Sequence, residues 1–207
     1  MVLPYVKISG ERFIIDLMYA RSDNMVGQAV YQTIGWGNLA VVHQDVMSLL
    51  NRLEPELKRL KLKLKICDAY RPKIAHEMMK KLIPMKGFFA ENAEMSQHCL
   101  GTALDVCLCD DEGKEFSYPT KVDAYDQEMS RQVLSGQSAL FMEHLQKARH
   151  DYQALGIDEE IKNREFLCEL MVGAGFEALE HEWWHYNLPL GKIDHYPLVS
   201  LKAEDFC

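Results

Sequence analysis

An aspartate stands in the middle of a run of apolar, strand-forming residues. Residues 102–109 read Thr-Ala-Leu-Asp-Val-Cys-Leu-Cys, so that Asp105 lies between Leu104 and Val106. A carboxylate buried among apolar side chains is strongly destabilising unless it has a polar partner or binds a metal. The fold must therefore bring a partner or a metal ion to this strand, and no other single residue constrains the chain as much.

Two other segments of the chain supply residues that could share a metal ion with this aspartate. His98 precedes Asp105 by seven residues, and Gly101 between them can form a turn that directs both side chains onto one ion. Residues 182–185, Glu-Trp-Trp-His, add a carboxylate and a further imidazole. Zinc prefers such ligands, and a catalytic zinc keeps one position for water. With Glu182 left unligated to move protons, these residues form the minimum set for hydrolysing an amide.

A competing motif overlaps the second segment. His181, Glu182 and His185 also satisfy H-E-x-x-H, in which both histidines bind zinc from one face of a helix and the glutamate is the base. We favour this interpretation less, because paired tryptophans followed closely by Pro189 are poor helix sequence, and the third histidine of the extended pattern is replaced by Gly191. Both interpretations share Glu182 and His185. They differ in the remaining ligands, which are His181 with His195 in one case and His98 with Asp105 in the other.

The periodicity of apolar residues predicts an α+β fold. An amphipathic helix is expected over residues 38–60, where Pro55 should end or kink it early. Pro72 can open a helix that reaches about residue 82, and Gly173 and Gly175 should end another over 159–173. The other expected elements are short strands and loops over 1–36, a helix at 137–155, strands at 62–67, 102–109, 176–179 and 183–188, and a turn at 110–113. We therefore expect a single domain over residues 1–207, with helices clustered around an antiparallel sheet.

Charge and hydropathy argue against several classes of function. The 23 basic and 31 acidic residues give a net charge of −8 without a dense basic run, whereas nucleic-acid binding requires a basic face. No stretch reaches the roughly 18 apolar residues of a membrane span, and the N-terminus has no secretory pattern. The six cysteines are scattered, so we expect reduced thiols and a cytoplasmic protein. Nothing in the sequence indicates an oligomeric state.

Four segments, in order and across nearly the whole chain, resemble the motifs of a known family. They are Asp16-x-x-Tyr19-Ala20-x-x-x-Asn24-x-x-Gly27, Asp68-x-Tyr70-Arg71-Pro72, Ser96-x-His98-x-x-Gly101-x-Ala103-x-Asp105 and Glu182-x-x-His185. This pattern resembles the D-alanyl-D-alanine dipeptidases of the VanX type, in the zinc peptidase group that also includes D,D-carboxypeptidases and the hedgehog domain. The resemblance implies the fold of that group, in which a central antiparallel sheet carries the zinc site.

The resemblance also implies roles for individual residues. One zinc ion per chain would be bound by His98, Asp105 and His185, and Glu182 would be the general acid and base. Arg71 would stabilise the oxyanion of the tetrahedral intermediate, which suits the fixed charge of a guanidinium.

The resemblance also implies that further residues would hold the two ends of the substrate. Ser96 would lie near the carboxylate end of the substrate, and Tyr19 would line the end that receives the free amine. The ammonium would be recognised by Asp123, which follows a Tyr-Pro-Thr turn, with Asp126 as the alternative.

Departures from the family pattern fall around the substrate pocket rather than on the ligands. Ala69 replaces a usual glycine, Met25 a phenylalanine and Tyr118 a methionine, and Cys99 directly follows His98. The expected substrate is therefore D-Ala-D-Ala or a related dipeptide that contains a D-amino acid.

Two cysteines share the face of Asp105 if the strand is regular. They are Cys107 and Cys109, whose thiolates could compete for zinc. We expect apolar packing for both, because the set of histidine and aspartate ligands is already complete.

The leading function is therefore that of a zinc dipeptidase whose only partner is a small dipeptide. One alternative is a D,D- or L,D-carboxypeptidase that trims longer peptidoglycan stem peptides. The other is a zinc-stabilised binding module without activity, which would need neither Glu182 nor Arg71.

Overall fold

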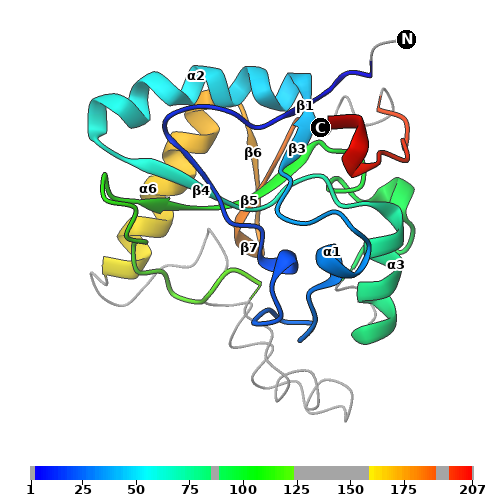
Figure 1. Cartoon of the computed structure of the whole chain (residues 1–207). Coiled ribbons are helices and arrows are strands. Elements are labelled where there is room, and N and C mark those ends of the chain that lie inside the picture. The colour runs from blue at the N-terminus through cyan, green and yellow to red at the C-terminus, as the bar shows by residue number, and fades with distance from the viewer. Residues whose placement is uncertain (1–2, 85–88, 124–158, 190–195, 207) are drawn as a thin grey trace.

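A five-stranded mixed sheet forms the centre of the computed structural model, which describes residues 3–84, 89–123, 159–189 and 196–206 (Figure 1). In sheet order the strands are β2 (Phe13–Ile15), β4 (Lys63–Asp68), β5 (Ala103–Cys109), β7 (Glu182–Asn187) and β6 (Glu177–Leu179). Neighbouring strands pair antiparallel except β2, which pairs parallel with β4. The α+β fold and its antiparallel centre are thus confirmed, and the parallel edge strand was not predicted.

Two long helices cover one face of this sheet. They are α2 (Gln44–Leu60) and α6 (Glu159–Ala174), which contact each other, while α2 also contacts β4 and α6 contacts β7 (Figure 1). Side chains alternate along a strand, so the apolar face of β5 consists of Leu104, Val106 and Leu108, all fully buried. The opposite face of β5 carries Asp105 and Cys107 and is left for the site.

Smaller elements surround that second face and the edges of the sheet. They are the two-stranded antiparallel pair of β1 (Tyr5–Lys7) and β3 (Val41–His43), the helices α1 (Val30–Thr33) and α3 (Lys73–Leu82), and the 3₁₀ turns η1 (Met18–Ala20), η2 (Ala93–Met95) and η4 (Ala203–Phe206). In the described part of the chain, no helix combines the length and the apolar character that crossing a membrane requires.

Several predicted elements are confirmed with small shifts of their ends. Pro72 immediately precedes α3, which ends at Leu82 as expected. The predicted turn closes with a hydrogen bond from the backbone N–H of Gly113 to the carbonyl oxygen of Asp110 (3.0 Å). The helix α6 includes Gly173 and ends before Gly175, whose φ of +108° is left-handed. The helix expected at 137–155 lies outside the described residues.

The helix predicted over residues 38–60 was wrong at its start. Residues 41–43 form β3 instead, because Val41 and Val42 are β-branched and pair with β1. The helix begins at Gln44, where the ring Nδ1 of His43 accepts a hydrogen bond from the backbone N–H of Asp45 (3.2 Å). Pro55 does not end the helix, because a buried apolar stripe continues on both sides of this exposed residue.

Candidate metal centre and active site

Three side chains from three segments converge on one point of the open sheet face. Asp105 on β5 and His185 on β7 are direct partners in the strand register, and His98 comes from the turn before β5. The Nδ1 atom of His185 lies 3.1 Å from Oδ1 of Asp105, and the Nε2 atom of His98 lies 3.3 Å from Oδ2 of Asp105. The two histidine nitrogens are 3.2 Å apart. All three residues are buried, and their donor atoms could hold one metal ion.

The spacing of these atoms fits a small tetrahedral cation. Ligands about 2.0–2.1 Å from a tetrahedral zinc ion are about 3.3–3.4 Å from one another. The three observed separations, 3.1–3.3 Å, come close to this value without any change of conformation. Two imidazoles and one carboxylate are also a donor set that zinc accepts while leaving a position for water. The residues present therefore fit a catalytic zinc ion.

The backbone around His98 fixes which ring nitrogen faces the cluster. The Nδ1–H of His98 donates to the carbonyl oxygen of Ala69 (2.9 Å), so Nε2 is the nitrogen directed at Asp105, and in the neutral ring it is free to bind a metal. The turn that presents His98 depends on Gly101, whose φ is +68°. A Cβ atom there would lie 2.7 Å from the ring of Tyr5, so only glycine fits.

The electrostatics of the cluster favour an ionised aspartate. Burial alone would raise the pKa of Asp105, but His98 and His185 hold it well below its usual range. For His98, burial lowers the pKa and the charge of Asp105 overcomes this effect, so the net shift is upward. An anionic carboxylate at the centre of two imidazoles is the state that a cation requires.

Glu182 lies beside the cluster without belonging to it. Its carboxylate is 3.8 Å from Nδ1 of His185, and its side chain keeps 29% of its surface exposed. Burial raises the pKa of Glu182 to about 7, the charges of Asp123 and Asp105 add to the shift, and His185 opposes it. A carboxyl group that titrates near neutral pH can both accept and return a proton.

Arg71 is held rigidly on the other side of the site by a residue to which the sequence assigned no role. Asp68 is completely buried and accepts hydrogen bonds from Nε and Nη2 of Arg71 (3.1 and 2.6 Å) and from the hydroxyl of Tyr31 (2.6 Å). The guanidinium also lies over the ring of Tyr19, 5.3 Å from its centroid. Asp68 stands inside the motif that contains Arg71, so its position was the available signal, but only the contacts reveal its function.

A cavity of about 200 Å³ connects these groups. Its lining includes the three residues of the cluster together with Arg71, Ser96, Asp123, Glu182 and Phe89. Asp123 is 9% exposed, has a φ of +47° and accepts a hydrogen bond from the hydroxyl of Tyr19 (2.5 Å). Burial, and then the charge of Asp105, raise the pKa of Asp123 to about 6. Every residue in the predicted site is therefore within this cavity or in contact with its wall, and Asp126 lies outside the described residues.

The competing ligands that the structure describes do not join the cluster, and His195 lies outside the described residues. Residues from Glu182 onward form a strand rather than the helix that the H-E-x-x-H motif needs, and the half-exposed His181 lies 3.8 Å from Glu180 instead. The thiols of Cys107 and Cys109 are buried, and among the described residues only His98, Asp105 and His185 form a metal-ligating group.

Comparison with known proteins identifies the family. The sequence model described as D-ala-D-ala dipeptidase matches residues 3–199. The chain is 28% identical over 186 residues to a D-alanyl-D-alanine dipeptidase of Escherichia coli (strain K12), an alignment that covers 90% of this chain and 83% of that protein. It is 25% identical over 196 residues to one of Enterococcus faecalis (strain ATCC 700802 / V583), with 84% of each chain covered. Because the family match spans nearly the whole sequence, the chain belongs to the D-Ala-D-Ala dipeptidase family of metallopeptidases.

Proposed function

We propose that the protein is a zinc-dependent dipeptidase that hydrolyses D-Ala-D-Ala or a related dipeptide containing a D-amino acid. The observation that carries this proposal is the convergence of His98, Asp105 and His185 beside Glu182 in one small cavity. The names of both curated relatives support the same reaction.

The arrangement of side chains suits the hydrolysis of a short peptide. His98, Asp105 and His185 would hold the zinc ion, which when bound supplies a Lewis acid that polarises a carbonyl and acidifies water. Glu182 takes the proton of the attacking water and later gives it to the leaving amine. Arg71, kept charged and oriented by Asp68, donates hydrogen bonds to the developing oxyanion.

The lining of the cavity offers groups for both charged ends of a free dipeptide. Ser96 would bind near the substrate carboxylate, and Asp123 with Tyr19 would form an acidic group for the free ammonium. A carboxylate that already accepts a hydrogen bond from a tyrosine hydroxyl can accept further hydrogen bonds from an ammonium and compensate its charge. With both termini bound, the substrate can be only two residues long.

The decisive experiment is a zinc assay combined with a screen of dipeptides in the LL, LD, DL and DD configurations, together with a tripeptide and a pentapeptide. We expect one zinc ion per chain, cleavage of one or more dipeptides that contain a D-amino acid, and no cleavage of the LL configuration. Preferential release of the last residue from the pentapeptide would indicate a carboxypeptidase instead, and zinc binding without any cleavage would indicate a binding module.

The role of Glu182 has its own test. Glu182→Gln should retain zinc and lower kcat by about 10²–10⁴-fold, because the side chain can no longer carry a proton. The matched control is Glu180→Gln, two residues away with a side chain that is 53% exposed, which should keep the parent's kcat. Full activity in Glu182→Gln would contradict the mechanism.

A further inference from the structure

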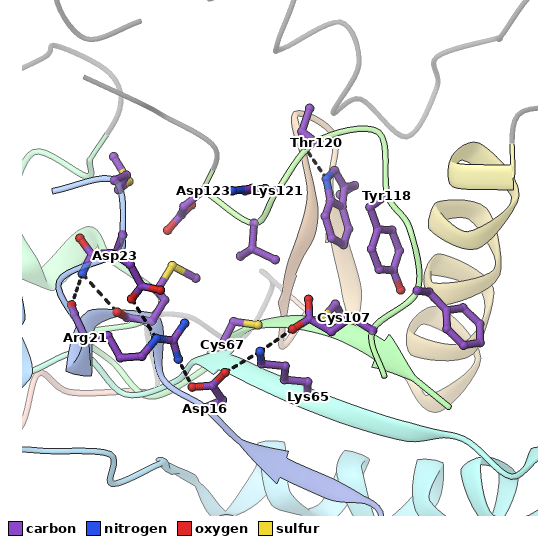
Figure 2. A pocket seen from close by; sticks show the side chains of 17 residues that line it. Asp16, Arg21, Asp23, Lys65, Cys67, Cys107, Tyr118, Thr120, Lys121 and Asp123 are labelled. Atoms are coloured by element: carbon purple, nitrogen blue, oxygen red, sulfur yellow. Dashed lines mark hydrogen bonds and ion pairs between the residues drawn. The ribbon is translucent and has the colours of Figure 1, made fainter. Parts of the chain in front are cut away.

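A second, larger cavity lies next to the metal centre on the same face of the sheet. Its volume is about 620 Å³, and Figure 2 shows how side chains from the segment 16–25, from β4 and β5, and from the segment 115–123 surround it. Of its lining residues, only Asp123 belongs to the predicted site. Its size is about three times that of the cavity around the metal cluster.

The strand register fixes how close the two cavities are. Cys107 on its floor is two residues beyond Asp105 on β5, and Trp183 in its wall is two residues before His185 on β7. A strand rises about 3.3 Å per residue, so this floor begins about 7 Å from the metal cluster, with side chains on the same face. Asp123 lines both cavities and therefore stands at their junction.

Parts of the cavity wall are apolar and can adapt to different side chains. Met18, Met25 and Val122 line them together with Trp183, whose indole stacks on the ring of Tyr118 with centroids 4.0 Å apart. Thioethers and aromatic rings adapt well to apolar side chains of different shapes. At two of these positions, Met25 and Tyr118, the sequence differs from the usual family motif.

The charged groups of the cavity are largely satisfied by one another. Lys65 lies 2.5 Å from both Asp16 and Glu115, and Arg21 pairs with Asp16 and Asp23 (Figure 2). Because these charges already have partners, they do not call for a charged ligand. Lys121 and Asp123 are further charged residues of the lining, so the part of the cavity that suits an uncharged, mainly apolar group is the part formed by the methionines and the aromatic rings.

We propose that this cavity is the subsite for the side chain of the first residue of the substrate, and that the enzyme prefers dipeptides in which this side chain is bulky and uncharged. The inference rests on the proposed function, in which the free ammonium binds Asp123 and the scissile carbonyl lies at the metal cluster. The first α-carbon joins these two groups, so its side chain starts next to Asp123. The cavity of about 200 Å³ leaves little room for more than a small dipeptide, whereas the cavity of about 620 Å³ is directly adjacent.

The test is a series of dipeptides that differ only in the first side chain, namely D-Ala-D-Ala, D-Met-D-Ala, D-Phe-D-Ala and D-Lys-D-Ala. Each buried methylene group should raise kcat/KM about fourfold, so we expect roughly a tenfold or greater preference for D-Met-D-Ala over D-Ala-D-Ala. A tenfold preference for D-Ala-D-Ala would overturn the inference and leave the proposed function intact. A preference for D-Lys-D-Ala would contradict the proposal that the first side chain of the substrate is uncharged. Cleavage of none of the four, with cleavage of another dipeptide from the stereochemical screen, would overturn this inference alone. Cleavage of no dipeptide at all would overturn the proposed function as well.

Variants that fill the cavity test whether the preference for a bulky first side chain depends on this space. Met25→Trp and Val122→Phe should each lower the ratio of kcat/KM for D-Met-D-Ala to that for D-Ala-D-Ala by at least about tenfold. The ratio is the useful quantity, because misfolding or a displaced Asp123 would lower kcat/KM for both dipeptides together. Val172→Phe, at a 49% exposed position on α6, is the matched control and should keep the parent's ratio. An unchanged ratio in both folded cavity variants would contradict the assignment.

Discussion

Asp68 illustrates how much of the site depends on a residue that would touch no substrate. Its carboxylate has no exposed surface, binds Arg71 through two nitrogens and lies 3.6 Å from Nδ1 of His98. A buried carboxylate of this kind orients the guanidinium and compensates its charge. We regard Asp68 as a positioning residue for Arg71.

Asp68→Asn should lower kcat by about 10–100-fold with little change in KM, because Arg71 would lose the orientation that it needs in the transition state. The measurement is a double-mutant cycle with Arg71→Lys. The two substitutions should be strongly non-additive if they affect one interaction. Tyr31→Phe, which removes the other hydrogen bond to Asp68 but leaves both bonds between Asp68 and Arg71, is the control and should have a smaller effect. Additive effects would leave Asp68 a purely structural role.

The identity of the histidine ligands can be tested with a matched pair of substitutions. His98→Ala should abolish stoichiometric zinc binding, because it removes one of three buried ligands. His181→Ala should bind zinc as the parent does, because its side chain is half exposed and lies outside the cluster. Metal content after dialysis, measured by mass spectrometry, distinguishes the two. The reverse result would restore the H-E-x-x-H interpretation.

At the scale of single elements, the end of α2 is held in an unfavourable backbone conformation. Lys61 follows the helix with φ of 57° and ψ of 44°, and its N–H closes the last turn on the carbonyl oxygens of Leu57 and Lys58. Glycine adopts this left-handed conformation without the steric cost that a side chain imposes. The residue is exposed, so that its side chain contributes little packing.

Lys61→Gly should therefore stabilise the protein by about 0.5–1 kcal/mol in urea unfolding. Lys58→Gly, three residues earlier inside the same helix and equally exposed, should instead destabilise it by about 1 kcal/mol. The opposite signs separate the capping effect from a general effect of glycine. Destabilisation by both substitutions would show that the side chain of Lys61 matters more than its backbone.

Helices and strands could be predicted where the residues that specify them are close together in the sequence. The run that contains Asp105 and the proline before α3 each specify an element by themselves, and both are confirmed. Residues 41–43 could not be assigned correctly, because helical spacing continues through them and only their pairing with β1 makes them a strand. The parallel pairing of β2 with β4 likewise depends on contacts between distant segments.

At the scale of the whole molecule, the candidate ligands could be predicted but their surroundings could not. His98, Asp105 and His185 lie in motifs that are recognisable in the sequence, and the fold brings them within 3.3 Å of one another. The contact between Tyr19 and Asp123 joins residues 104 positions apart. The cavity beside it is built from segments that meet only after folding, and periodicity contains no information about such a space.

The stability of the whole molecule should depend on a histidine that folding buries in its neutral form. His76 on α3 is 1% exposed, and its Nε2 lies 3.0 Å from the carbonyl oxygen of Ala90. Its Nδ1 is buried without a hydrogen-bond partner, so a second proton there would be unsatisfied. Burial, and then the charge of Arg71, lower the pKa of His76 from 6.5 to about 4.

The direction of the pH effect follows from this lowered pKa. Between about pH 6.5 and pH 4, His76 is protonated in the unfolded chain but neutral in the folded chain. The free energy of unfolding should therefore fall as the pH falls through this window. His76→Gln retains a donor for Ala90 but cannot titrate, so its unfolding free energy should depend less steeply on pH between 6.5 and 4. Urea unfolding of both proteins without metal makes the comparison, because the titration of the candidate ligands is then common to both. Parallel pH profiles would mean that His76 binds its second proton equally well in the folded chain.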